Sequence, residues 1–146
     1  VIGKTARHVT PVQAMDHVLG YAPFNDGSVR EWQKHSIYAG KNFANSGSWG
    51  PWIATADDLP PVEDLHLTVT LNGETLQSAY GQEMIFSLPE QIAYASSLFT
   101  LYPGDVIATG SPDGTGGSRV PKRYLRAHDV LTISIQGIGT LSNAVS

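Results

Sequence analysis

An alternating stretch near the middle of the chain constrains the fold most strongly. Apolar and polar side chains alternate over residues 65–71, Asn72-Gly73 follows directly, and a second extended stretch runs over 74–79. One-sided alternation is typical of a half-buried strand, and Asn-Gly favours the type I′ turn between antiparallel strands. The sequence therefore predicts a β-hairpin, which needs further strands and an apolar core to be stable.

Two helices are predicted on either side of this hairpin. Thr10-Pro11 suits the start of a short helix that ends near Gly20. Ser87 and Glu90 have the spacing of a capping box, and the apolar residues that follow repeat at helical intervals. We therefore expect a second helix over 88–100.

Further strands and loops complete the expected fold. An apolar run predicts a buried strand at 106–109, and two more strands are expected at 130–136 and 138–145, separated by Gly137 and Gly139. The chain also has 15 Gly and 9 Pro, which is typical of a domain rich in turns. The expected fold class is mainly β with two or more short helices (α+β), in a single domain over residues 1–146.

The composition excludes several classes of function. The formal charge of −4 leaves no basic excess for a phosphate backbone, so we expect no nucleic-acid partner. The absence of Cys excludes thiol nucleophiles and Cys-ligated metals. No apolar run is long enough to span a membrane and no leader pattern is evident, so the sequence predicts a cytoplasmic protein with no membrane partner.

One loop carries the residue types that bind small acids. Asp26 lies in a turn, and Arg30 and Gln33 follow four and seven residues later, so a helix after Ser28 would direct all three side chains to one cleft. Asp26 could bind a hard cation, Arg30 a carboxylate and Gln33 a carbonyl. The alternative is a helix start capped by Asp26, with Arg30 in solvent.

Three other segments are open to two interpretations. Lys41, between a glycine and an aromatic residue, could stabilise charge in a pocket or could be solvated. The loop over 110–117 has four glycines and could be a wide surface turn or the wall of a pocket, but it lacks the pattern of a P-loop. The aromatic residues of Trp49-Gly50-Pro51-Trp52 could form a platform for a ligand, but we expect them in the core.

Seven short segments stand in a fixed order along nearly the whole chain. They are Val1-Ile2-Gly3-Lys4, Asn25-Asp26-Gly27-Ser28-Val29-Arg30, Gly40-Lys41-Asn42-Phe43, Gly50-Pro51-Trp52, Leu71-Asn72-Gly73-Glu74, Pro103-Gly104-Asp105-Val106-Ile107-Ala108-Thr109-Gly110-Ser111-Pro112 and Ile138-Gly139-Thr140-Leu141-Ser142-Asn143. In this order they closely resemble the C-terminal catalytic domain of the fumarylacetoacetate hydrolase superfamily. The resemblance implies a mixed β-sandwich roll, a homodimer, and bound Mg²⁺ or Mn²⁺.

The resemblance also implies roles for individual residues. Asp26 matches a metal ligand, while Arg30 and Lys41 match catalytic positions that contact the substrate. Gln33 and the segment Thr109-Gly110-Ser111 match substrate-binding positions, with serine at 111 where threonine is common. Two further carboxylate ligands, in a Glu-x-Glu pair, and the lid with the water-activating base lie upstream of Val1 in the family. On this basis the 146 residues are not expected to hold the metal well by themselves.

The function implied is that of an enzyme acting on a small 2-oxo acid in catabolism. Our first expectation is a divalent-metal-dependent hydrolase of a C–C bond in an acylpyruvate or fumarylpyruvate. The alternatives are a 2-hydroxyhepta-2,4-dienedioate isomerase, a hydratase and an oxo-acid decarboxylase. An alternative of another class is a non-catalytic fragment or dimerisation scaffold.

Overall fold

The predicted hairpin is present in the computed structural model, which describes residues 1–146. It consists of β5 (His66–Leu71) and β6 (Glu74–Tyr80), which pair antiparallel. Asn72 and Gly73 at the turn have φ values of 53° and 86°, as a type I′ turn requires. The prediction of a hairpin with this turn is confirmed.

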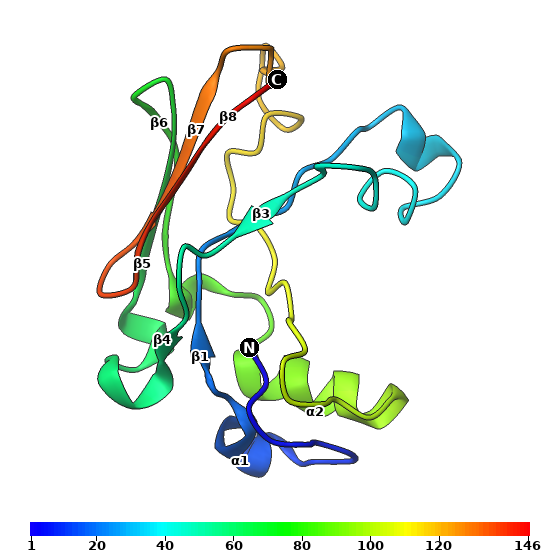
Figure 1. Ribbon diagram of the computed structural model, residues 1–146, viewed down its shortest axis with the longest axis vertical. Helices are drawn as coiled ribbons and strands as arrows, with labels where there is room; N and C mark the ends of the chain where they lie inside the picture. The colour runs from blue at the N-terminus through cyan, green and yellow to red at the C-terminus, as the bar shows by residue number, and fades with distance from the viewer.

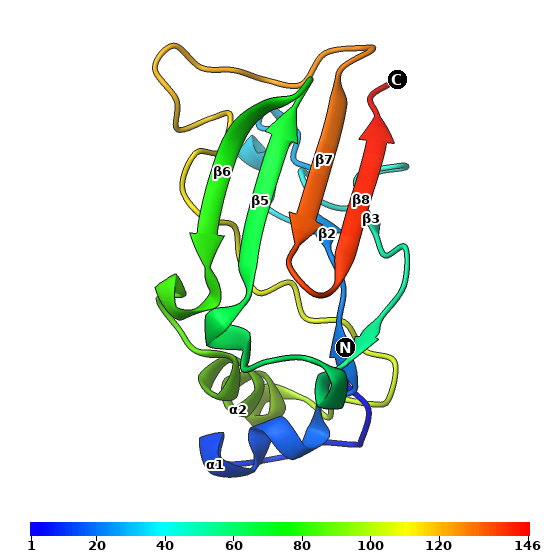
Figure 2. The same cartoon turned by 90° about the vertical axis from the view of Figure 1, so that its left-hand side faces the viewer.

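The two C-terminal strands extend the hairpin into a four-stranded antiparallel sheet. β7 (Val130–Ile135) pairs with β5, and β8 (Gly139–Ala144) pairs with β7, so the strand order is β6-β5-β7-β8 (Figure 2). Both strands were predicted and are confirmed. β6 and β8 are the edges of this sheet.

The two faces of the sheet differ in chemistry. One face carries a buried apolar cluster of Val69, Leu71, Leu131 and Ile133. The opposite face carries hydroxyl side chains that pair across the strands, including Ser134 with Thr140 at 2.9 Å. The apolar face therefore points towards the rest of the chain, which lies on that side of the sheet (Figure 1).

Both predicted helices form and pack at one end of the sheet (Figure 1). The first is α1 (Pro11–Ala14), which continues as the 3₁₀ turn η1 (Met15–His17). The second is α2 (Leu88–Leu98), where Glu90 accepts hydrogen bonds from the backbone nitrogen and Oγ of Ser87 at 2.8 and 2.6 Å. These bonds lower the pKa of the Glu90 carboxyl.

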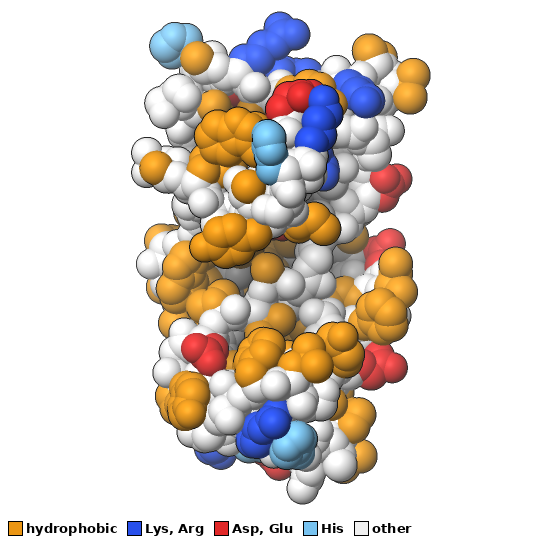
Figure 3. All heavy atoms as spheres, turned by 90° about the vertical axis from the view of Figure 1, so that its right-hand side faces the viewer, with side chains coloured by type: hydrophobic (Ala, Val, Ile, Leu, Met, Phe, Trp, Pro, Cys, Tyr) orange, Lys and Arg blue, Asp and Glu red, His pale blue; other side chains and the backbone are white.

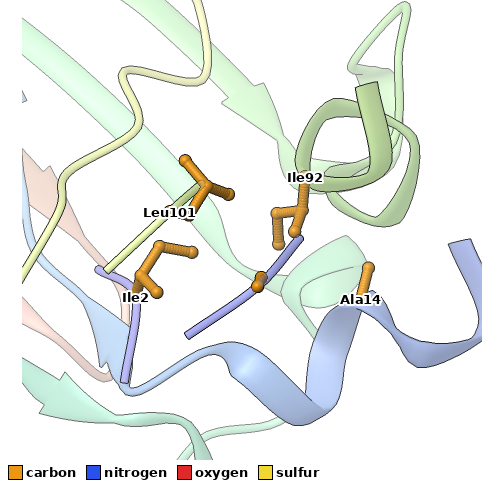
Figure 4. Close-up of a cluster of buried hydrophobic side chains, with 5 residues drawn as sticks. Ile2, Ala14, Ile92 and Leu101 are labelled. Carbon is orange, nitrogen blue, oxygen red and sulfur yellow. The ribbon is translucent and has the colours of Figure 1, made fainter. Parts of the chain in front are cut away.

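A second apolar cluster joins the helices to the N-terminal segment. It contains Ile2 and Ala6 of the N-terminal segment, Ala14 of α1, Ile92 of α2, and Leu101 from the segment after α2 (Figure 4). Ile2 also donates from its backbone nitrogen to the carbonyl of Asp105 at 2.9 Å. The core of this chain is therefore divided into two clusters, one at the helices and one on the sheet.

Two short ribbons connect the helical end to the sheet. β1 (Gly20–Tyr21) pairs with β4 (Ala54–Thr55), and β2 (Phe24–Asn25) pairs with β3 (Ser48–Trp49). Between β2 and β3 the chain extends away from the sheet, and we call residues 26–47 the arm (Figure 1). No helix is both long enough and apolar enough to cross a membrane.

One prediction about an element is wrong. The segment 106–109 is not a buried strand, because no neighbouring strand pairs with it and Val106 is 43% exposed. The helix considered after Ser28 is present only as the 3₁₀ turn η2 (Trp32–Lys34), because the chain folds back and Val29 donates to the carbonyl of Gly40.

The expected burial of two tryptophans is also wrong, since Trp49 is 47% and Trp52 57% exposed. The side chain of Trp52 lies against the turn between β7 and β8, where its indole nitrogen donates to the carbonyl of Ile138 at 2.6 Å. Despite these differences, the fold is mainly β with few short helices, as predicted.

Candidate functional site

Asp26 lies at the base of the arm, where the two strands of the β2–β3 ribbon separate. Gly27 and Gly47 face the opposite strand so closely that a Cβ atom would collide with the carbonyl oxygen of Ser46 or Asn25. Glycine is therefore required for the two strands to approach each other at this point. The close pairing holds Asp26 at a defined place beside the returning strand.

An ion pair joins Asp26, the first residue of the arm, to Lys41 on its returning half. Lys41 Nζ donates to Asp26 Oδ2, and the two side chains are 30% and 34% exposed respectively. The pair is therefore partly shielded from solvent and still reachable by a small molecule. Sequence reasoning named both residues but did not predict that they contact each other.

Arg30 and Gln33 form a second pair on the same arm. Arg30 Nη1 donates to Gln33 Oε1 at 3.0 Å. Gly40 packs against the side chain of Gln33, and a Cβ at this position would collide with Gln33 Cγ. Because Lys41 follows Gly40 directly, the two pairs lie on neighbouring segments of the arm.

The glycine-rich loop approaches the arm through Gly117. A Cβ atom on Gly117 would lie 3.5 Å from Arg30 Nε. Thr109, Gly110 and Ser111 are exposed, and the carbonyl of Thr109 accepts from Gln91 Nε2 at 3.4 Å. No hydrogen bond or ion pair joins these three residues to Asp26 or Arg30, so the structure brings the loop to the arm only at its far end.

The loop returns to the sheet at Asp129, which sequence reasoning missed. Its carboxylate accepts from Arg123 Nη2 at 3.1 Å, from Asn72 Nδ2 at 2.8 Å and from the backbone nitrogen of Arg126 at 2.9 Å. These hydrogen bonds, that of Arg123 most strongly, lower the pKa of the Asp129 carboxyl to about 2. An aspartate directly before a strand, after a basic segment, was the only available signal.

Gln77 on β6 is a second residue that sequence reasoning missed. Its Nε2 donates to the carbonyls of Pro112 and Asp113 in the loop, at 2.6 and 3.2 Å. A lone glutamine in an alternating strand carries no signal for such a contact, because the contact depends on how the distant loop packs.

The chain supplies only part of a site for Mg²⁺ or Mn²⁺. Asp26 offers the hard oxygen donor that both ions prefer, but no three His, Asp or Glu side chains in residues 1–146 lie close enough to hold an ion. One carboxylate paired with an ammonium group does not complete a metal site. The residues of this chain alone therefore do not fit the metal.

Comparison with known proteins gives a consistent family match. The family model described as fumarylacetoacetate (FAA) hydrolase C-terminal matches residues 1–146. The oxaloacetate tautomerase YisK of Bacillus subtilis is 39% identical over 147 residues, which cover 99% of this chain and 49% of that protein. The chain spans about half the length of the curated relatives it matches.

Two solved structures extend the match to the fold. Fumarylacetoacetate hydrolase from Exiguobacterium antarcticum has a TM-score of 0.95 and 38% identity, over 100% of this chain and 53% of that chain. Maleylpyruvate hydrolase from Sphingobium sp. SYK-6, in complex with manganese(II) and pyruvate, has a TM-score of 0.87 and 33% identity, over 99% and 50%. The predicted fold type is therefore confirmed.

Proposed function

This chain belongs to the fumarylacetoacetate hydrolase family, and on this basis we propose that the protein hydrolyses a C–C bond of an acylpyruvate or fumarylpyruvate. The observation that carries the proposal is the partly shielded ion pair of Asp26 and Lys41, on the same arm as Arg30 and Gln33. Together these residues offer a hard oxygen ligand, a localised positive charge and two groups that recognise carboxylate or carbonyl oxygens. A small 2-oxo acid has the complementary set of oxygens.

Asp26 is the ligand that we propose for Mg²⁺ or Mn²⁺. The manganese complex of the Sphingobium structure supports this choice of ion. Since the 146 residues do not complete a site, this proposal requires further ligands from groups outside them. We therefore derive no step of the reaction through the ion.

The roles proposed for this chain's own residues follow from their charge. Arg30 and the segment Thr109-Gly110-Ser111 bind the carboxylate of the substrate, and Gln33 donates to a carbonyl oxygen. In hydrolysis, water adds to the acyl carbonyl carbon, and the bond from that carbon to the pyruvyl methylene breaks. The electron pair passes into the enolate of pyruvate, which then takes up a proton. Lys41 stabilises the negative charge that develops on this enolate.

Isomerisation or tautomerisation of a 2-oxo acid is the second candidate function. The tautomerase from Bacillus subtilis, which matches 99% of this chain, favours it. Both reactions pass through an enol or enolate of a 2-oxo acid, so the roles of Arg30 and Lys41 are the same. The group that activates water distinguishes hydrolysis from these reactions, and we assign that group to no residue of this chain.

The proposal is tested by replacing Asp26 in the protein as its gene encodes it. We expect Asp26→Ala to weaken Mn²⁺ binding in a titration and to lower acylpyruvate turnover together, by about 100-fold. Asp57→Ala, an exposed carboxylate on the 3₁₀ turn η3 (Ala56–Asp58), is the matched control and should change neither. Full metal-dependent activity in Asp26→Ala would refute the assignment. A parent protein with no saturable Mn²⁺ site would favour the non-catalytic scaffold.

A further inference from the structure

The glycine-rich loop is attached to edge strand β6 by two side chains, Gln77 and Arg119. Gln77 Nε2 donates to the carbonyls of Pro112 and Asp113, as described above. Arg119 Nε donates to the carbonyl of Gly114 at 3.1 Å, and Nη2 donates to the carbonyl of Leu76 at 2.8 Å. Four hydrogen bonds therefore tie the loop to this strand or close it on itself, and we call Gln77 and Arg119 the loop clamp.

A β-bulge in β6 provides the geometry for this clamp. Gln77 pairs with Val69 and Thr75 pairs with Thr70, so Leu76 is an extra residue with no partner on β5. A bulge leaves its extra residue outside the regular ladder and re-aims nearby side chains. The carbonyl of Leu76 is thus available to Arg119. Gln77, opposite Val69, points to the face of the sheet on which the loop lies.

Two glycines allow the loop backbone to approach its supports closely. Gly114 has a φ of +93°, and a Cβ there would collide with the carbonyl oxygen of Leu76. A Cβ on Gly116 would collide with the carbonyl oxygen of Arg123. The absence of a side chain there lets the backbone nitrogen of Arg123 donate to the carbonyl of Gly116 at 3.0 Å. A Cβ on Gly117 would lie 3.5 Å from Arg30 Nε, so this end of the loop lies beside the arm. The loop is therefore fastened to β6 on one side and lies beside the arm on the other.

We propose that Gln77 and Arg119 are positioning residues, which set the distance between the substrate-binding loop and Arg30. This inference rests on the proposed function, in which Arg30 and Thr109-Gly110-Ser111 bind one substrate carboxylate. Neither clamp residue contacts the substrate. They act by holding the loop backbone where Arg30 and Thr109-Gly110-Ser111 reach the same carboxylate. A small displacement of either group would weaken the binding of that carboxylate.

A purely structural role predicts a different result from a positioning role. A structural residue would lower the urea midpoint of the whole protein when replaced, with substrate affinity unchanged in the folded fraction. A positioning residue would weaken substrate binding and raise KM, while the protein stays folded and kcat changes little. The two roles are therefore separated by measuring affinity and stability on the same variants.

The test uses the protein as its gene encodes it, loaded with Mn²⁺, and sodium pyruvate as the probe. We expect Gln77→Leu and Arg119→Gln each to weaken pyruvate binding and raise KM by about tenfold, with kcat within about threefold. Arg119→Lys keeps one donor and should lose less than Arg119→Gln. Gln82→Leu, at an exposed glutamine beyond the end of β6, is the matched control and should bind as the parent does.

Amide hydrogen exchange gives a readout that does not depend on the substrate. We expect faster exchange in residues 109–117 of Gln77→Leu, with β5 and β7 unchanged. Parent-like exchange and parent-like pyruvate affinity in both Gln77→Leu and Arg119→Gln would overturn this inference and leave the proposed function in place. A parent protein that neither binds pyruvate nor turns over a 2-oxo acid would overturn the proposed function, and the inference with it.

Discussion

At the scale of single residues, Asp129 shows how one carboxylate can join three parts of the chain. Asp129 itself stands directly before β7. Its carboxylate binds the turn of the hairpin through Asn72, and the basic segment 122–126 through the side chain of Arg123 and the backbone nitrogen of Arg126. Only about a tenth of its side chain is exposed. The ionised form is therefore the one that the folded structure stabilises.

This stabilisation predicts a loss of stability in acid. The pKa of Asp129 is about 2 in the folded chain against an ordinary value of 3.8, so its contribution is fully present above about pH 4 and is lost as the pH falls towards 2. We expect the free energy of unfolding to fall over this range in urea titrations. Asp129→Asn should be less stable at pH 7 and should show a flatter fall below pH 4. An equally steep fall in Asp129→Asn would contradict this assignment.

Lys41 gives a second prediction at this scale. Its ammonium group occupies Asp26 Oδ2, so removing it frees that oxygen and cannot weaken a cation bound there. We expect Lys41→Ala to lower turnover by about 100-fold, because the developing enolate loses its positive neighbour, with Mn²⁺ affinity equal to or tighter than that of the parent. Calorimetric Mn²⁺ titration and steady-state kinetics on the same preparation check both parts. Lys34→Ala, whose lysine pairs with Glu31 on the exposed side of the arm, is the control.

The four arm residues of the candidate site were named from the sequence, but their arrangement was not predicted. Asp26, Arg30 and Lys41 stand out because charged groups beside glycine and turn residues are typical of binding loops. Their pairing, Asp26 with Lys41 and Arg30 with Gln33, depends on how the arm folds back at Gly40. The spacing of these residues along the sequence does not predict how the arm folds back.

At the scale of elements, the hairpin turn is the feature that the sequence predicts most directly. Gly73 has a φ of 86° and no heavy atom near its Cβ position, so a side chain there meets backbone strain and no steric clash. We expect Gly73→Ala to lower the free energy of unfolding by about 1 kcal/mol. Gly73→Asn should lose less, because asparagine tolerates left-handed backbone better. Equal losses in both variants, measured by urea unfolding, would show that the turn conformation is not the cause.

Elements whose signals are local were predicted correctly, and those that need a distant partner were not. Ser87 and Glu90 are enough to place the start of α2, and alternation places β5. The segment 106–109 has the apolar side chains of a buried strand, but a strand also needs a neighbour, and none pairs with it within these residues. The bulge at Leu76 was likewise invisible, because register depends on both strands of a pair.

At the scale of the whole molecule, the apolar side chains are divided between two small clusters and an extensive exposed surface. Only 19 of 146 residues are buried. Apolar side chains are spread over the face opposite the sheet from one end of the molecule to the other (Figure 3). Exposed large apolar side chains in and near α2 include Ile85, Phe86, Tyr94, Leu98, Phe99 and Tyr102. A surface of this kind is typical of a domain that packs against another domain or another copy.

An apolar groove beside α2 makes this expectation testable. It is lined by Ala95, Phe99, Leu101, Val106 and Ile107, with Asp105 as the single charged residue. We expect the 146-residue chain, prepared by itself, to enhance the fluorescence of 1-anilinonaphthalene-8-sulfonate and to elute from a sizing column at a mass that rises with concentration.

The control for this expectation alters the groove without altering the core. Phe99→Ser and Val106→Ser replace residues that are 56% and 43% exposed, so they should reduce dye binding and association with little loss of stability. Each replacement removes apolar surface from contact with water in the free chain, while the buried clusters at Ile92 and Val69 stay intact. A parent chain that stays monomeric at all concentrations and binds no dye would show that the exposed side chains are not an association surface. The two buried clusters would then be enough for the chain to fold as an independent domain.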